Sequence, residues 1–487
     1  MKLRRIILII FLVLVGASII YALMDQRKVT TSSDKAYQAY LRGEELTYRL
    51  YTHEALDEFE KAVKLDPNFA SAYTRLAWLY KSFDRDREYQ DAKNRALGLL
   101  DRVKDKEKLV INLTFARLED KAADVDRFKQ ELLTKFPDSF EAREALANDY
   151  FARMDYQKSI EENLKILKID PEFASGYNIL AYSYFHIGEY DKALESIDKY
   201  SSLAPDQANP YDSHGELLLY LGRYDEALEQ FRKADSIKQG LYFVMSHIGD
   251  TYKEKGMYRD AIGAYLKARE ISPNERIKAN IDDNIAICYI ESNQMDKGVE
   301  ILKEVIGRNP GELKANAILG DIYSREGKME EALLQLGIVK GITSQLLASG
   351  APDNKERLSI PNAEHYTAGR IALAKGDYGE AISHFSTLYT MSSMPDKVLF
   401  GSFLGESLLK AGQADSAIAV LTSVLKNNPN SGLCLRFLAD AYGQFGQKDA
   451  QRGALARYLT VMKDADEGNK EVGKALTQLE QLGSRNP

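Results

Sequence analysis

One helical hairpin recurs along this chain, and the stretch from Tyr177 to Pro205 shows it most clearly. Its apolar and small residues recur at intervals of three and four, which places them on one face of each of two short helices. These residues are Leu180, Ala181 and Tyr184, followed by Ala193, Ile197 and Tyr200. Gly188 predicts the end of the first helix, Asp191 is expected to cap the second, and Pro205 ends it.

The hairpin repeats at a fixed interval. Pro137, Pro171 and Pro205 follow one another at steps of 34 residues, and Pro273 lies two such steps further on. One amphipathic hairpin cannot bury its apolar face alone, so hairpins of this kind must stack on one another. With 487 residues the chain is also too long for one compact core. The period therefore predicts an all-α fold, an α-solenoid of stacked hairpins.

The repeated residues resemble those of the tetratricopeptide repeat (TPR) family. Within that family, the chain resembles membrane-anchored proteins of the bacterial type. The first half of that family's motif is matched by Tyr73, Leu76, Ala77, Tyr80; by Tyr177, Leu180, Ala181, Tyr184; and by Met245, Ile248, Gly249, Tyr252. The second half is matched by Ala55, Phe59, Ala62, Pro67 and by Ala261, Tyr265, Ala268, Pro273. The resemblance implies a right-handed superhelix of about twelve helix–turn–helix repeats between Ala36 and Asp466.

A polar, turn-forming segment interrupts the repeats. Residues 341–361 include Ser349-Gly350-Ala351-Pro352, which predicts a flexible joint or an ordered loop. We therefore expect an array of about nine repeats over 36–340 and a second of about three over 362–487. The helical spacing of Val472, Ala475 and Leu479 predicts a helix that caps the last repeat.

The N-terminus carries a membrane signal. Ile6 to Met24 is an apolar run of 19 residues, which would span roughly 28 Å as a helix. Lys2, Arg4 and Arg5 precede it, so residues 1–28 are expected to form one uncleaved transmembrane anchor with a cytoplasmic N-terminus. Residues 29–35 read as a tether, and the repeats would lie outside the cytoplasm, in the periplasm of a Gram-negative cell. The alternative is a cleaved signal peptide and a secreted protein.

Catalytic and metal-binding patterns are not found in the sequence. Cys288 and Cys434 lie in different repeats, so a disulfide is not expected, and they fit no zinc spacing. The six histidines form no close pair at metal-ligand spacing. The net charge of −7 is spread along the chain, which argues against nucleic acid as a partner. No cofactor and no small-molecule substrate are expected.

The remaining candidates are surface positions. In tetratricopeptide arrays the first helix of each repeat lines the concave side, where the family holds peptides or proteins. The matching positions here, which we treat as candidate partner-binding residues, are Trp78, Phe151, Asn178, Tyr182, Phe185, Asp212, Glu216, Asp250 and Asp321. The aromatic members are either anchors for a partner or packing between repeats. The acidic members either select a basic or amphipathic segment or serve solubility.

These patterns together predict a non-catalytic scaffold that binds protein or peptide partners on the concave face of a membrane-anchored array. One alternative is an accessory or regulatory subunit of a membrane enzyme, or of a secretion or envelope-assembly complex. A third hypothesis is an enzyme with its active site in the groove. The lysine/asparagine pair with which some family members grip a C-terminal carboxylate is missing, since Tyr182 and Glu216 stand at two of the matching positions.

Overall fold

A computed structural model describes residues 29–137, 139–348 and 360–483. Within these ranges the secondary structure is helical throughout, with 25 α-helices and one short 3₁₀ helix at Leu100–Arg102. The chain divides into two compact units, which meet in sequence between Leu146 and Ala147, inside α8. No pattern in the sequence predicts a boundary at this point, and the predicted division at residues 341–361 stays a prediction. The predicted anchor over residues 1–28 lies outside the described residues.

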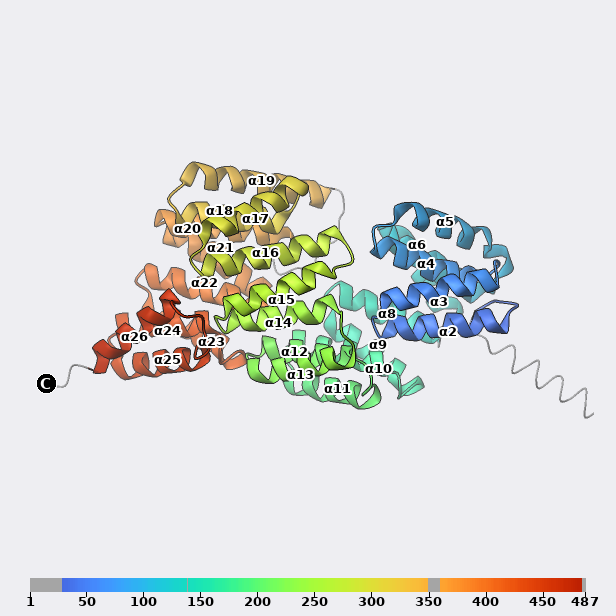
Figure 1. Ribbon diagram of the computed structural model, residues 1–487, viewed down its shortest axis with the longest axis horizontal. Helices are drawn as coiled ribbons and strands as arrows, with labels where there is room; N and C mark the ends of the chain where they lie inside the picture. The colour runs from blue at the N-terminus through green and yellow to red at the C-terminus, as the bar shows by residue number, and fades with distance from the viewer. Residues whose placement is uncertain (1–28, 138, 349–359, 484–487) are drawn as a thin grey trace, which may run out of the picture. The chain divides into compact units, whose positions relative to one another are not determined.

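Helices α2 to α25 form twelve successive repeats, each made of a first and a second helix, and α26 follows the last repeat (Figure 1). The first helices are α2 (Asp34–Tyr48), α4 (Ala70–Ser82), α6 (Asp105–Leu118), α8 (Phe140–Ala152), α10 (Ala174–His186), α12 (Asn209–Tyr220), α14 (Tyr242–Glu254), α16 (Glu275–Glu291), α18 (Leu313–Arg325), α20 (Ile360–Lys375), α22 (Asp396–Lys410) and α24 (Gly432–Gln444). The second helices are α3 (Thr52–Leu65), α5 (Asp86–Gly98), α7 (Ala122–Lys135), α9 (Tyr156–Ile169), α11 (Tyr190–Leu203), α13 (Tyr224–Ile237), α15 (Tyr258–Glu270), α17 (Met295–Arg308), α19 (Met329–Ala348), α21 (Tyr378–Met391), α23 (Ala414–Asn427) and α25 (Lys448–Val461); α26 is Lys470–Gly483. The predicted count of about twelve repeats is confirmed, while the handedness of the superhelix stays a prediction.

The turn inside each hairpin needs one residue in the left-handed backbone region. Gly188 has a φ of 84°, and its amide donates to the Phe185 carbonyl oxygen, closing the end of α10. The next helix begins at Tyr190 with Glu189 as its N-cap residue, so the prediction that Asp191 caps α11 is wrong. Asp191 lies instead in the first turn of α11, where its negative charge interacts favourably with the helix dipole.

Hairpins close because a small residue on the first helix meets a ring on the second. A Cβ atom on Gly215 in α12 would lie 2.6 Å from the Phe231 ring of α13, and one on Gly43 in α2 would lie 2.6 Å from Phe59 of α3. Phe231 and Phe59 are both fully buried. This close approach is the physical reason for the small residue in the repeated motif.

In unit 1 the residues that precede the first helix are held against the repeats. The amide and hydroxyl of Thr30 donate to Glu107 Oε2 at 2.8 and 2.6 Å, and the Thr31 hydroxyl donates to Asp66 Oδ2 at 2.6 Å. Val29 packs against the apolar core of the unit. The segment expected to be a polar tether is therefore hydrogen-bonded to unit 1 over residues 30–32.

In unit 2 the helices before and after residues 349–359 pack together. Helix α20 contacts both α18 and α19, and one apolar core runs from Ala317 in α18 to Ala475 in α26. In α26, Ala475 is buried, and Val472 and Leu479 pack against the same core. None of the helices in the described ranges is long and apolar enough to cross a membrane.

Candidate functional site

Polar side chains on neighbouring first helices are paired across the repeat boundary, and we call this set of pairs the first-helix ladder. In unit 2, the Tyr182 hydroxyl of α10 donates to Glu216 of α12, 34 residues later. Asp212 of α12 lies 2.9 Å from His247 Nδ1 of α14, 35 residues later. A separation of about one repeat places both partners at equivalent positions of successive first helices.

The His247 pair is an ion pair in the folded chain. Burial disfavours a charged imidazole, but the attraction of Asp212 and its hydrogen bond outweigh burial and raise the pKa of His247 to about 10. Glu216 Oε1 lies 3.9 Å from His247 Nε2 and accepts a hydrogen bond from Tyr220. The cluster therefore holds one imidazolium between two carboxylates. These charged groups are already paired with one another within the chain.

A second part of the ladder centres on Arg370 in α20. Its Nε lies 2.6 Å from Asp321 Oδ1 of α18, and its Nη1 lies 3.0 Å from Glu406 Oε2 of α22. Its guanidinium also lies 4.7 Å from the Phe403 ring centroid, and Tyr366 donates to Asp321 Oδ2 at 3.4 Å. The side chains of Arg370 and Asp321 are each 10% exposed, so this cluster fastens three first helices together in a largely dry environment.

Unit 1 has rungs of the same kind. Arg75 in α4 makes two contacts of 2.6 Å with the carboxylate of Glu44 in α2. Lys106 in α6 lies 3.0 Å from Glu141 in α8. Glu144 lies one helical turn after Glu141, and burial raises the pKa of its carboxyl group.

The aromatic candidates differ in how far they can reach a partner. Phe185 is 1% exposed and packs between Tyr190 and Tyr220, at ring-centroid distances of 5.2 and 5.8 Å. Trp78 is half-buried against the core of unit 1, and Phe151 is half-buried in unit 2, 5.5 Å from the Tyr156 ring. In this structure Phe185 packs between repeats and cannot reach a partner. Trp78 and Phe151 are packed in part and remain partly exposed.

The polar candidates all lie on first helices, and most have partners within the chain. Asp212 and Asp321 are 4% and 7% exposed and form the ladder pairs described above. Asp250 in α14 accepts from Lys253 and from the Tyr265 hydroxyl, each at 2.8 Å. Asn178 in α10 differs, because its side-chain Oδ1 has no hydrogen-bond partner within the described residues. These carboxylates therefore attract a basic segment less strongly than the sequence predicts, because groups within the chain already pair with them.

The sequence patterns select the acidic half of these pairs, Asp212 and Asp321, but do not pair these residues with His247 or Arg370. A search for opposite charge about one repeat away would have found both, because His247 follows Asp212 by 35 residues and Arg370 precedes Glu406 by 36. The pair between Arg370 and Asp321 spans 49 residues, since residues 349–359 intervene. The repeat period does not predict that pair, which is visible only in the structure.

Other chemically active groups give no reaction centre in the described residues. The thiols of Cys288 and Cys434 are buried, and burial raises the pKa of each to about 12. The Nδ1 atoms of His365 and His384 lie 2.9 Å apart, but no group of three or more potential metal ligands occurs within the described ranges. The two histidines are 19 residues apart and lie on α20 and α21, the two helices of one hairpin.

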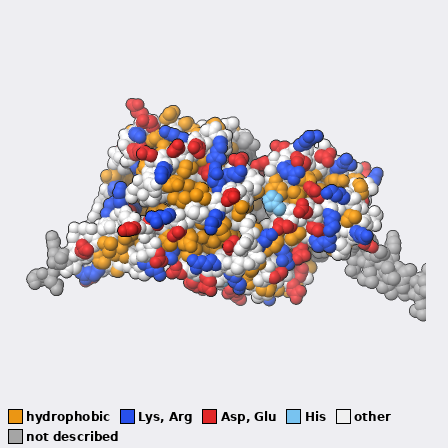
Figure 2. All heavy atoms as spheres, viewed as in Figure 1, with side chains coloured by type: hydrophobic (Ala, Val, Ile, Leu, Met, Phe, Trp, Pro, Cys, Tyr) orange, Lys and Arg blue, Asp and Glu red, His pale blue; other side chains and the backbone are white. Residues whose placement is uncertain are grey.

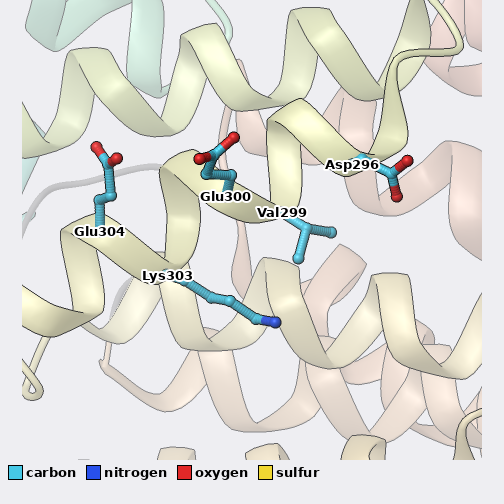
Figure 3. A pocket seen from close by; sticks show the side chains of 5 residues that line it. All are labelled: Asp296, Val299, Glu300, Lys303 and Glu304. Atoms are coloured by element: carbon cyan, nitrogen blue, oxygen red, sulfur yellow. The ribbon is translucent and has the colours of Figure 1, made fainter.

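One hollow on the described surface is wide open to solvent. A hollow of about 550 Å³ is lined by Asp296, Val299, Glu300, Lys303 and Glu304. Figure 3 shows that all five side chains come from the second helix α17, with Glu300 and Glu304 on one side and Lys303 on another. Basic and acidic side chains are interspersed over the face of the molecule in Figure 2. None of the candidate partner-binding residues lines this hollow.

Successive helical hairpins with paired polar side chains on their first helices define a helical repeat protein. The tetratricopeptide-repeat family is matched at residues 58–94, 174–207, 208–240 and 372–440. The chain is a tetratricopeptide-repeat protein, of a scaffold fold that is typically non-catalytic, and none of the matching families is an enzyme family. Comparison with the sequences of curated proteins finds no significant match.

Several solved structures are similar to this chain at low sequence identity. The Cut9–Hcn1 hetero-tetramer of the APC/C has 16% identity and a TM-score of 0.45, over 94% of this chain and 79% of that chain. MamA has 22% identity and a TM-score of 0.29, over 34% of this chain and 94% of its own. YrrB, described as a tetratricopeptide-repeat protein with an unusual peptide-binding site, has 17% identity and a TM-score of 0.28, over 38% and 95%.

Proposed function

We propose that the chain is a non-catalytic scaffold that binds an extended segment of a partner protein along the first helices of unit 2. The supporting observation is a row of half-buried polar side chains on α10, α12 and α14: Asn178, Tyr182, Glu216 and Asp250. We call these four residues the first-helix row. Asn178 Oδ1 is buried without a hydrogen-bond partner within the described residues, so rotation of this side chain toward a bound segment would give the acceptor a partner.

The ladder makes this row suitable for binding. Tyr182 and Glu216 hold each other in place, and Asp250 is fixed by Lys253 and Tyr265. Side chains that are already ordered lose little conformational entropy when a partner binds. The row therefore supports recognition of an extended segment by hydrogen bonds from a rigid surface.

The test is a crosslinking pull-down from native membranes with the full chain as bait. We expect Asn178→Ala combined with Tyr182→Ala to lower capture of the specific partner by about tenfold or more, since central contacts dominate binding energy. Leu164→Ala is the matched control, because Leu164 is 43% exposed on the second helix α9 and should leave capture unchanged.

Two outcomes would count against the scaffold. Equal capture by the double variant and the wild type would rule out the first-helix row as the binding site. If the wild type recovers no protein or peptide, the scaffold function itself is ruled out. A catalytic membrane complex among the captured proteins would favour the alternative of an accessory subunit. Turnover by the purified chain would favour the enzyme hypothesis.

We also propose that residues 1–28 anchor the chain in a membrane, with the repeats outside the cytoplasm. The supporting observation is the apolar run from Ile6 to Met24 after three basic residues. A reporter enzyme that works only outside the cytoplasm, fused after Pro487, is expected to be active. A reporter active only in the cytoplasm would reverse this orientation, and sequencing of the mature N-terminus would separate an anchor from a cleaved signal.

A further inference from the structure

Three hairpin turns in the first half of unit 2 contact three loops near its end. In the first contact, His186 Nδ1 at the end of α10 lies 3.1 Å from the Ser393 hydroxyl, 207 residues later. Met394 and Val398, which follow in sequence, pack into the apolar cluster that contains Phe185. Figure 1 shows the orange and red C-terminal helices returning beside the green helices α12 to α15.

The second contact lies one repeat further along, at the turn between α12 and α13. Asn428 Nδ2 donates to the Tyr220 carbonyl oxygen at 3.1 Å, and Asn430 Nδ2 donates to the Gly222 carbonyl oxygen at 2.8 Å. The Tyr224 hydroxyl donates to the Asn430 carbonyl oxygen at 3.3 Å. A Cβ atom on Gly222 would lie only 2.2 Å from Asn428 Oδ1, so the loop seats directly on this glycine.

The third contact lies a further repeat along, at the turn between α14 and α15. The Asp466 amide donates to the Gly256 carbonyl oxygen at 3.1 Å, and Asp466 Oδ2 accepts from the Arg259 amide at 3.0 Å. Lys255 Nζ lies 2.6 Å from Asp225 and 3.1 Å from Asp464, and Lys255 is 6% exposed.

The chemistry of the second and third contacts is that of helix capping. The last carbonyls and first amides of an α-helix have no partner within the helix. Asparagine amides from one loop meet the carbonyl oxygens at and just after the end of α12, and the Asp466 carboxylate accepts an amide from the first turn of α15. The three contacts recur at separations of 206 to 210 residues, the same number of repeats each time.

In a simple repeat array each repeat contacts only its neighbours, so disturbance of one repeat fades along the chain. We propose that the three contacts form an intramolecular seam that closes unit 2 on itself. The seam locks the last three repeats onto the hairpins α10–α15, which carry the first-helix row. It couples the folding of α24–α26 to that of α14 and α15 without passing through the repeats between them. The proposal stands without the proposed function, because it concerns contacts within the chain.

Hydrogen exchange on the full chain tests the seam. We expect Asp466→Ala to speed exchange of the Arg259 amide by about tenfold and of the amides in the middle of α15, which Asp466 does not touch, by about threefold. Asp449→Ala is the matched control, because its carboxylate, 98% exposed, is paired with Arg452 in the same C-terminal repeat. The control should leave α15 unchanged.

A pair of glycine variants tests the second contact independently. Gly222 and Gly188 have similar left-handed φ angles of 73° and 84°, so alanine strains both turns alike. Only at Gly222 would the new Cβ atom meet another side chain, Asn428; at Gly188 nothing lies within 4 Å. Gly222→Ala is therefore expected to speed exchange around residues 428–432, and Gly188→Ala is not.

Two results would overturn the seam. The first is unchanged exchange of Arg259 and α15 in the Asp466→Ala variant, or an equal change in Asp449→Ala. The second is the same exchange around residues 428–432 in both glycine variants. Adding Asn428→Ala to Gly222→Ala leaves the strained turn but removes the clash, so α13 should exchange more slowly in this combination than in Gly222→Ala alone if the clash contributes to the effect.

Discussion

Arg370→Met is expected to destabilise unit 2 by about 3–5 kcal/mol, the usual cost of removing one partner of a buried ion pair. Methionine fills much of the space of the arginine side chain, so loss of packing is small. The carboxylates of Asp321 and Glu406, with side chains 10% and 16% exposed, would then lie close together without their shared cation. Urea denaturation of the full chain, with hydrogen exchange of α18, α20 and α22, measures the effect.

A surface arginine and a compensated variant separate this effect from the loss of any arginine. Arg452→Met should cost less than about 1 kcal/mol, since its ion pair with Asp449 is exposed. Arg370→Met combined with Asp321→Asn and Glu406→Gln should recover much of the loss, because no uncompensated charge remains buried. A cost for Arg370→Met no larger than that for Arg452→Met would show that the cluster does not fasten the three helices.

The hairpins could be predicted from the sequence because each depends on local spacing. The small residue at Gly215 and the ring at Phe231 lie in one hairpin, and the turn glycine lies between them, so the period alone places them. The same holds for Tyr177 to Pro205, where α10 and α11 end as the pattern indicates. The cap was misassigned because Glu189, whose side chain makes no capping hydrogen bond, stands at the N-cap position.

The candidate site was only partly predictable, because a position on a helix face does not reveal what lies opposite. Asp212 and Asp321 were placed on the right helices, but their partners His247 and Arg370 decide whether their charge is available. Phe185 shows the same limit, since the rings that bury it belong to α11 and α12. The seam could not be predicted from the sequence, because contacts 206 to 210 residues apart depend on the pitch of the array, which no local pattern encodes.

Phe231→Ala is expected to destabilise unit 2 by about 3–5 kcal/mol, the range for removing a buried aromatic side chain. Phe231 is fully buried, and its ring lies against the Gly215 backbone, so its removal leaves a cavity between α12 and α13. Hydrogen exchange of α12 and α13 should rise first, because the cavity lies between them. Urea denaturation of the full chain gives the total loss.

The control for this second prediction is Phe445→Ala, since Phe445 is 48% exposed and its removal should cost less than about 1 kcal/mol. The combination of Phe231→Ala with Gly215→Ala tests the mechanism. A methyl group on Gly215 would overlap the wild-type ring but would enter the space left by Phe231→Ala, so it should restore part of the lost stability. If the added methyl group instead lowers stability further, the close approach of Gly215 and Phe231 does not set the distance between the two helices.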